Sequence, residues 1–312
     1  MNKHVTSILQ ALLVTFLWST SFLIIKKVLP TIPPVTFAGL RYFLASLCLL
    51  PFAFRPSHRS EISKLNKRQW MKLLLLGLIF YVLTQGTQFL GLSLLPSASV
   101  SLMLNFTPLV VIALSAALLN EKPSGRQLVG IVLFISGALV YFLPLSDIGS
   151  QVIGLTVMVL GVISNATSSV LGRNVNRKKD LCPFTITLIS MSVGSLVLLQ
   201  LGLVIEGVPN IPLKSWLSLI WLSGVNTAIA FTLWNRTLRH LTAMESSIIN
   251  GTMLIQIAIL AWVFLGENLS ISNIGGMLIA SVGAVLVQLR PRVDIERQDC
   301  LDYAEDAANN SY

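Results

Sequence analysis

Long apolar stretches alternate with short polar breaks along most of the chain. A helix needs about 20 mostly apolar residues to cross a membrane, and prolines lie in or beside the breaks, where helices end. The pattern therefore predicts ten spanning helices, at residues 5–25, 35–54, 71–92, 97–119, 126–143, 152–172, 183–205, 216–237, 244–265 and 271–289.

The second half of this pattern repeats the first. A shift of 146 positions places identical residues on one another: Trp70 on Trp216, Glu121 on Glu267, Gly130 on Gly276 and Gly137 on Gly283. The period is far longer than the roughly 20 to 50 residues of solenoid repeats, so each copy is half a molecule. We predict two five-helix repeats, at residues 1–145 and 150–290.

Composition agrees with a protein embedded in lipid. Of the 312 residues, 54% are hydrophobic and 11% are charged, whereas roughly a quarter are charged in soluble domains. The net charge of +9 does not predict a nucleic-acid partner, because the basic residues lie between apolar runs instead of on one polar face. The three cysteines lie far apart, which predicts neither a disulfide framework nor a zinc site.

The positions of lysine and arginine predict the orientation, because these residues are retained on the cytoplasmic side during insertion. With the amino terminus inside, 18 of the 22 lie in cytoplasmic loops, three lie outside and Arg41 falls within the second helix. We expect a multi-pass protein of the inner membrane with both termini cytoplasmic. Because five is an odd number of spans, the two repeats have opposite orientations in the membrane, as in transporters that work by alternating access. Residues 291–312 hold six of the 13 acidic residues and predict a disordered cytoplasmic tail.

Polar side chains inside spanning helices are expected to face protein or a water-filled path. Four in the third helix share one face, at i, i+3, i+4 and i+7: Tyr81, Thr84, Gln85 and Gln88. Their counterparts in the eighth helix make an aromatic wall opposite these amides: Thr227, Phe231 and Trp234. Other helices add Trp18, Ser19, Asn105, Asn165 and Asn250. We predict that these residues line a substrate cavity, although for each one alone a hydrogen bond between packed helices is the favoured alternative.

Four further residues are expected to have gating or structural roles. Arg41 has two possible functional roles, in binding a carboxylate or in gating. The structural alternative, in which helix-end carbonyls or Glu267 hold it in place, is favoured. Pro108 permits a kink in the fourth helix. Glu121 and Glu267 are expected to end helices at opposite membrane faces.

The repeated glycines of the fifth and tenth helices recur every seven residues and share a helix face. They predict close helix packing, either within one chain or between two copies in a homodimer.

Several kinds of chemistry find no support in the sequence. No acidic residue lies near the middle of a span, so nothing directly indicates proton coupling. The chain contains no Walker loop, no HExxH motif and no Gly-x-Ser-x-Gly motif. We therefore predict no enzyme activity, no cofactor and no metal.

Short segments in both halves are typical of one transporter family. They are Trp18-Ser19, Arg41-Tyr42-Phe43-Leu44-Ala45, Pro108 followed by Glu121, and the segments at 216–220, 230–236 and 265–267. In order and spacing, these segments resemble the EamA repeat of the drug/metabolite transporter superfamily, over residues 8–290. The resemblance implies a ten-helix secondary transporter with a cavity lined by helices one, three, four, six, eight and nine. Many relatives export amino acids or other metabolites. The family's second repeat usually has a proline where this chain has Leu254.

The sequence thus predicts an all-α membrane protein that exports a small neutral or zwitterionic metabolite, such as an amino acid, by alternating access. One alternative is a nucleotide-sugar or organophosphate exchanger, whose substrate would require several convergent cations. Another is a membrane scaffold or sensor without transport, whose function would not change on substitution of Gln85, Gln88 or Trp234.

Overall fold

A computed structural model describes residues 3–119, 124–143, 148–177, 181–237, 241 and 243–288. Glu121 and the acidic tail at 291–312 lie outside these residues. Within the described ranges the chain is helical and contains no strand. The elements of the first half are α1 (Lys3–Val28), α2 (Pro34–Ala53), α3 (Pro56–Ser63), α4 (Lys67–Gly77), η1 (Leu78–Gln85), α5 (Gly86–Leu94), α6 (Ser97–Leu104), α7 (Thr107–Leu119) and α8 (Gly125–Tyr141). Those of the second half are α9 (Ile148–Arg177), α10 (Pro183–Glu206), α11 (Leu213–Ser223), η3 (Gly224–Ile229), α12 (Ala230–Thr237), α13 (Ala243–Leu265) and α14 (Ile271–Gln288).

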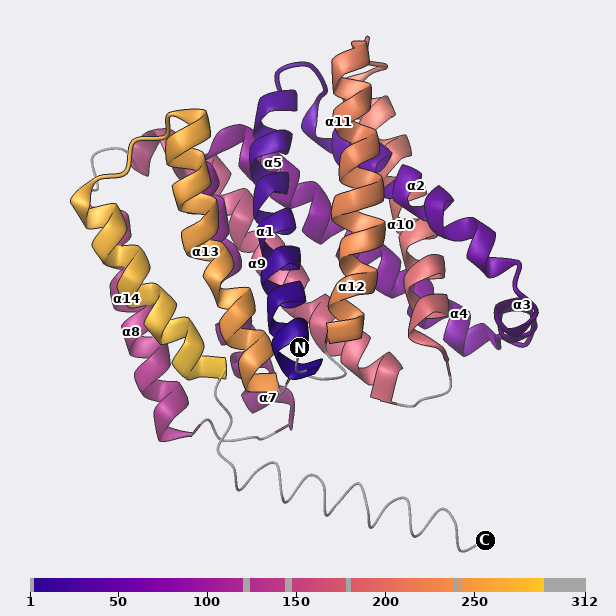
Figure 1. Ribbon diagram of the computed structural model, residues 1–312, viewed down its shortest axis with the longest axis horizontal. Helices are drawn as coiled ribbons and strands as arrows, with labels where there is room; N and C mark the ends of the chain where they lie inside the picture. Colours follow the sequence, from indigo (N-terminus) through magenta and orange to yellow (C-terminus); the bar gives the residue numbers. More distant parts are fainter. Residues whose placement is uncertain are drawn as a thin grey trace, which may run out of the picture.

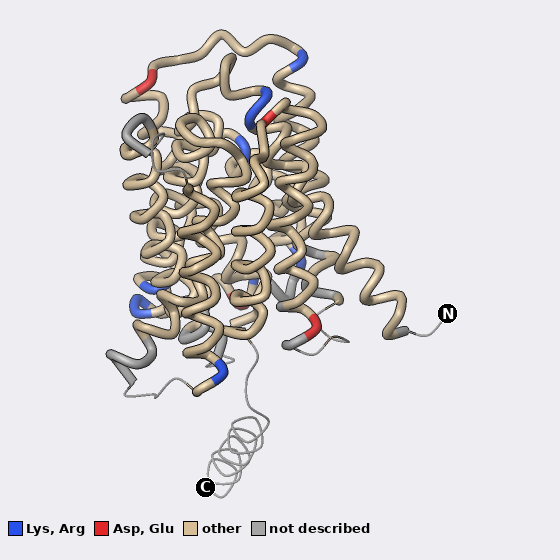
Figure 2. Tube along the Cα trace, turned by 90° about the vertical axis from the view of Figure 1, so that its left-hand side faces the viewer, with Lys and Arg blue, Asp and Glu red and all other residues tan. Residues whose placement is uncertain are grey.

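These elements correspond to the ten predicted spans, so the all-α membrane fold is confirmed. In the described part of the chain, eight helices are long and apolar enough to cross a membrane, and α8 is a shorter apolar helix. The third and eighth spans each contain a π-helical segment, η1 or η3. The helices stand side by side, and α1 begins on the side where α14 ends (Figure 1). Charged positions gather towards the two ends of the bundle (Figure 2).

Corresponding helices of the two halves pack against each other. The second spans, α2 and α10, form one such pair, and the fifth spans, α8 and α14, form the other. The π-helical segments also correspond, since η1 begins at Leu78 and η3 begins 146 positions later, at Gly224. Two similar halves therefore form one bundle, with equivalent contacts on each side.

Glycine allows α8 and α14 to pack with their backbones almost in contact. A Cβ atom added to Gly137 would lie 2.6 Å from Gly276 O, and one added to Gly276 would lie 2.6 Å from Gly137 O. Gly130 and Gly283 approach in the same way, with a Cβ on Gly130 lying 2.9 Å from Gly283 O. The small residues thus serve packing within the chain, as small residues commonly do between helices in lipid.

Carboxylates from one half hold the starts of helices in the other half. The side chain of Glu206, at the end of α10, accepts hydrogen bonds from the amides of Val35 (3.0 Å) and Thr36 (2.8 Å). These amides begin α2 and have no partner within their own helix. Glu61, at the end of α3, reciprocates by accepting hydrogen bonds from Cys182 N and Thr185 Oγ1 at the start of α10.

Glu267 makes a third contact of this kind. Helix α13 ends at Leu265, and the following Gly266 has a φ of 66°, in the left-handed region that suits glycine. The carboxylate of Glu267, the next residue, accepts a hydrogen bond from Ser97 N at 2.8 Å, where α6 begins. The alternative in which Glu267 holds Arg41 is not seen among the described residues, because this carboxylate accepts from the backbone of α6 and Arg41 Nε donates to Thr227 Oγ1.

The fourth span breaks where Pro108 was expected to permit a kink. Helix α6 ends at Leu104, and α7 begins at Thr107. A proline cannot donate a backbone hydrogen bond to the preceding turn. In contrast, α13 runs without a break through Leu254, the residue at the equivalent position. The two halves thus differ in backbone shape at this position.

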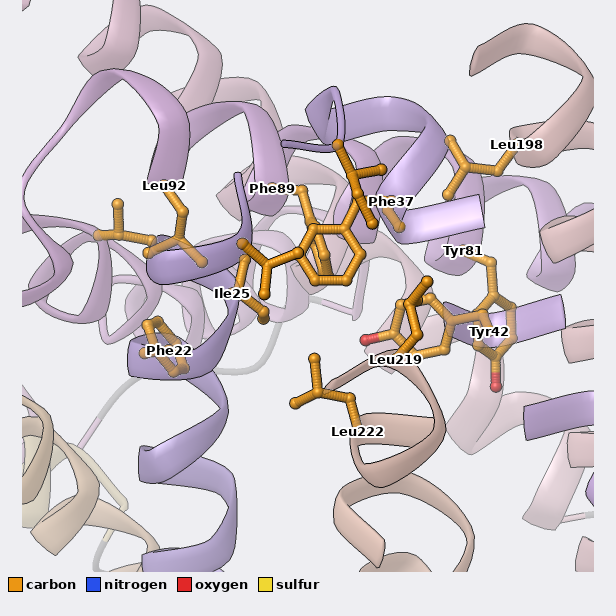
Figure 3. Packing of buried hydrophobic residues seen from close by; sticks show 14 of the residues in the cluster. Phe22, Ile25, Phe37, Tyr42, Tyr81, Phe89, Leu92, Leu198, Leu219 and Leu222 are labelled. Atoms are coloured by element: carbon orange, nitrogen blue, oxygen red, sulfur yellow. The ribbon is translucent and has the colours of Figure 1, made fainter. Parts of the chain in front are cut away.

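The apolar core gathers around α2, η1 and α5. Phe37 and Phe89 are fully buried, and their ring centroids are 5.2 Å apart in an edge-to-face arrangement. Tyr42 and Tyr81 lie beside them, with ring centroids 5.3 Å apart (Figure 3). This cluster also contains Leu219 and Leu222 of α11, so it joins the two halves.

Neighbouring glycines on α14 allow a controlled test of the packing. Gly276→Ala places a methyl group against the backbone of α8, whereas a Cβ on Gly275 meets nothing within 4 Å. We expect Gly276→Ala to destabilise the purified protein by about 1–3 kcal/mol, the typical effect of overpacking. The measurement is thermal unfolding in detergent. Gly275→Ala should leave the midpoint unchanged or raise it slightly, and equal effects at both positions would contradict the observed packing.

Candidate functional site

A cavity of about 450 Å³ lies between the two halves. Among the described residues, every span except the fifth and the seventh contributes to it. The second and tenth spans join those that the family resemblance implied. Its lining combines polar and aromatic residues: Trp18, Ser21, Phe22, Arg41, Tyr42, Phe80, Thr84, Gln85, Gln88, Ser101, Leu104, Asn105, Thr107, Pro108, Asn165, Phe231, Asn250, Gly251, Met253, Ile257 and Gln288.

The third span brings three of its four candidate residues to the cavity. Thr84, Gln85 and Gln88 line it, whereas Tyr81 packs against Tyr42 and Phe80 in the apolar core. The cause is η1, because a π-helical turn contains more residues than an α-helical turn. Its wider turns change the spacing, so that Phe80 lines the cavity with Thr84 in place of Tyr81.

Aromatic rings form the opposite wall. The Trp18 ring lies 5.2 Å from that of Phe231 and 5.3 Å from that of Trp234, measured between centroids. The indole N–H of Trp18 donates to Asn226 O at 3.2 Å, which fixes its orientation. Trp18 and Phe231 line the cavity, whereas Trp234 packs against Trp18 and is not among the lining residues.

Two other candidates lie behind the wall and join helices. Ser19 donates to Thr15 O within α1 and also contacts Gln256 Oε1 of α13 at 3.0 Å. Thr227 is buried in η3, where its hydroxyl donates to Leu222 O at 2.9 Å. The Ser19–Gln256 contact and the bond that Thr227 Oγ1 accepts from Arg41 Nε of α2 join packed helices, as polar residues commonly do in membranes.

The three candidate asparagines lie on the cavity wall. Asn105 occupies the break between α6 and α7, where its amide donates to Ser101 O at 2.9 Å. Asn165 donates to Thr107 Oγ1 at 3.1 Å and so connects α9 to the start of α7. With Asn250 on α13, they place amide groups on three different spans around one space.

Arg41 lies in the cavity wall on the side of α2. Only 5% of the residue is exposed, and its Nε donates to Thr227 Oγ1 at 3.3 Å. The guanidinium lies 5.3 Å from the ring centroid of Tyr42, which is within the range of a cation–π contact. This position is about 10 Å along α2 from its start at Pro34.

Sequence reasoning missed two residues that position this wall. Asn226 is fully buried in η3, and its amide donates to Ser21 Oγ at 2.7 Å and to Leu17 O on α1. Tyr42 donates to Gln85 Oε1 at 2.6 Å and so holds that amide in place. Asn226 could have been found as an amide within an apolar run, whereas nothing in the pattern pairs Tyr42 with Gln85.

Lys26 also has a role that its predicted place in an outside loop did not suggest. It lies in the last turn of α1, and its ammonium donates to Leu92 O and Leu95 O, both at 2.6 Å. These carbonyls end α5 and have no partner within the helix. Lys26 thus joins the first span to the end of the third.

A polar and aromatic cavity between two similar halves of a membrane bundle is the architecture of a secondary transporter. A family model described as the EamA-like transporter family matches residues 5–143 and again residues 152–289. The chain belongs to the EamA-like transporter family, whose members act on small-molecule solutes within a lipid bilayer.

Individual relatives are similar over most of their length. An uncharacterized transporter of Bacillus subtilis, YoaV, is 25% identical over 86% of this chain and 92% of its own. A protein of Escherichia coli named "Probable amino-acid metabolite efflux pump" is 29% identical over 73% of this chain and 76% of its own. An S-adenosylmethionine/S-adenosylhomocysteine transporter of Chlamydia muridarum is 24% identical over 81% of this chain and 82% of its own.

A solved crystal structure shares the fold. It has 18% sequence identity, covers 90% of this chain and 97% of its own, and superimposes with a TM-score of 0.63. The names of the family and of these sequence relatives describe transporters.

The contact between Tyr42 and Gln85 allows a test in which the variants differ in one hydroxyl group. We expect Tyr42→Phe to weaken the apparent affinity for the transported solute about threefold to tenfold, the effect of losing one net hydrogen bond. The measurement is the KM of flux in proteoliposomes. Tyr81→Phe is the control, because Tyr81 lies in the same cluster but does not line the cavity. Equal KM values for Tyr42→Phe and the wild type would show that Gln85 needs no support from Tyr42.

Proposed function

We propose that this protein exports a small neutral or zwitterionic metabolite, such as an amino acid, across the inner membrane by alternating access. The observation that carries the proposal is the composition of the cavity wall, in which amides, hydroxyls and aromatic rings surround a single arginine among the described residues. Such a lining offers hydrogen bonds to a polar solute and apolar contact to its side chain.

The charge of the wall favours this class over phosphorylated solutes. A phosphate ester carries about two negative charges at neutral pH and is bound by several converging Lys or Arg residues or by a metal. Within the described residues, the cavity lining includes Arg41 but no lysine, aspartate or glutamate. A nucleotide sugar or organophosphate would therefore lack most of the charge that it needs.

The names of two relatives support an amino-acid-like solute. One is named for an amino-acid metabolite and the other for S-adenosylmethionine and S-adenosylhomocysteine. All of these compounds are related to α-amino acids, and the last two carry an α-amino carboxylate at one end. The relatives are less than 30% identical to this chain, so they indicate a class of solute and not one compound.

The arrangement of contacts also supports a cavity that opens towards the cytoplasm. Lys26 and Glu267 tie α1, α5 and α6 together at the end of the bundle where α1 ends and α6 begins. Gln288, the last residue of α14, contributes to the cavity from the opposite end, where α1 begins. Together with the predicted cytoplasmic termini, these contacts support our proposal of an inward-open state that loads solute from inside the cell.

Efflux from proteoliposomes tests the proposal directly. Liposomes loaded with the twenty standard amino acids should release one or a few of them faster than protein-free liposomes. Gln85→Leu and Gln88→Leu should each lower this flux about threefold to tenfold, because each removes hydrogen bonds to the solute. Thr87→Val is the matched control, since the Thr87 hydroxyl bonds to Leu83 O of its own helix.

Other outcomes favour the alternatives. Release that requires an external phosphate ester would indicate an organophosphate exchanger. Flux of no tested solute, together with cellular phenotypes unchanged by Gln85→Leu and Gln88→Leu, would favour a scaffold or sensor. Comparing flux with and without a pH gradient decides whether transport is coupled to protons.

The proposed orientation has its own measurement. A green fluorescent protein fused after Tyr312 should be fluorescent in cells, and an alkaline phosphatase fused at the same position should be inactive, because the former folds in the cytoplasm and the latter outside it. The same pair of reporters inserted after Pro209, in the break between the seventh and eighth spans, should give the reverse result. Matching signals at both positions would contradict the predicted topology.

A further inference from the structure

Arg41 is a charged residue within the membrane that has no acidic partner among the described residues. In the described part of the chain, no carboxylate lies within ion-pair distance of its guanidinium. Its one side-chain hydrogen bond runs from Nε to Thr227 Oγ1, and its remaining contact is with the ring of Tyr42. A buried arginine is costly in a membrane unless it is paired.

The terminal nitrogens of Arg41 face the cavity. The buried side-chain nitrogen and oxygen atoms that lack a hydrogen bond, among the described residues, are Ser97 Oγ and Asn226 Oδ1. The two terminal nitrogens of Arg41 make no hydrogen bond to the described residues, yet they are not among these buried atoms without a partner. They are therefore exposed to open space. Because Arg41 lines the cavity, that space is the cavity itself.

Lys26 shows how the same fold satisfies a cation that has a structural role. Its ammonium donates two hydrogen bonds of 2.6 Å to carbonyls at the end of α5, and Glu267 lies nearby. Arg41 has neither helix-end carbonyls nor a carboxylate. The structural alternative favoured for Arg41 from sequence therefore lacks the contacts that it requires.

We propose that Arg41 is the binding site for the carboxylate of the transported solute. This inference rests on the proposed function and narrows it to solutes with one carboxylate. The paired terminal N–H groups of a guanidinium match the two oxygens of a carboxylate. A single negative charge neutralises Arg41, whereas a phosphate ester would leave an excess negative charge in the membrane interior.

The rest of the wall fits the other end of such a solute. An ammonium group finds amide oxygens on Asn105, Asn165 and Asn250 and the faces of Trp18 and Phe231. Thr227 is a positioning residue. Its hydroxyl donates to Leu222 O and accepts from Arg41 Nε, which directs the terminal nitrogens towards the cavity.

A comparison of carboxylates with carboxamides tests the proposal without depending on transport. The full-length protein in detergent is titrated with each neutral L-amino acid and with its carboxamide, and the thermal unfolding midpoint is recorded. We expect at least one amino acid to raise the midpoint and its carboxamide to require about tenfold to a hundredfold higher concentration. This ratio corresponds to a charged hydrogen-bond pair.

Variants separate a binding role from a structural one. Arg41→Met should keep or raise the unfolding midpoint without ligand, because it removes an unpaired buried charge, and it should abolish the preference for carboxylate. Arg41→Lys should restore part of the preference. Lys26→Met is the matched control, which should lower the midpoint without ligand and leave the preference intact.

Several results would overturn the proposal. Three concern the ligands: equal stabilisation by amino acids and carboxamides, no stabilisation by either, and stronger stabilisation by glycerol 3-phosphate. The fourth is an Arg41→Met variant with a lower unfolding midpoint that still prefers the carboxylate. Flux of amino acids and carboxamides at equal rates would refute the carboxylate site and leave the exporter proposal standing. Carboxylate-selective binding without flux would support the carboxylate site and refute the exporter proposal.

Discussion

The bundle depends on satisfying the backbone N–H groups at helix starts in an environment that offers little water. In lipid, each unpaired backbone group costs several kcal/mol. Glu206 satisfies the start of α2, Glu61 the start of α10 and Glu267 the start of α6. In each case the carboxylate and the helix belong to different halves of the chain. Backbone satisfaction at the ends therefore also holds the halves together.

With the ends held, irregular backbone can be concentrated in the middle of the bundle. The π-helical segments η1 and η3 and the break after Leu104 all lie beside the cavity. Non-helical or distorted backbone at membrane depth is tolerated where it is covered by protein or lines a cavity. These segments also free side chains from regular spacing, so Gln85 and Thr227 make contacts that a regular helix would place elsewhere.

The sequence predicted what depends on length and composition. Ten apolar stretches became ten spans, and Pro108 marked a real break, because apolar length and the chemistry of proline act locally. It predicted less about which residues face the cavity. Tyr81 turned into the core because η1 changed the helical period, and no simple sequence signal marks a π-helical segment. The sequence also did not indicate that Glu267 binds the start of α6, since that contact depends on the positions of both halves.

The difference between the halves at Arg41 explains how a nearly symmetric scaffold can hold an asymmetric solute. The second span begins Pro34-Val35-Thr36, and the seventh begins Pro183-Phe184-Thr185. When these starts are aligned, Ser190 is the residue equivalent to Arg41. The Ser190 hydroxyl bonds to Ile186 O of its own helix, and its backbone packs against Gly77. One half thus uses the position for packing and the other places a charge there. Because exchange between two inverted states requires only a shared backbone design, the side chains that face the solute are free to differ. In the proposed carboxylate site, Arg41, the one cation in the described cavity lining, orients a solute that has one anionic end.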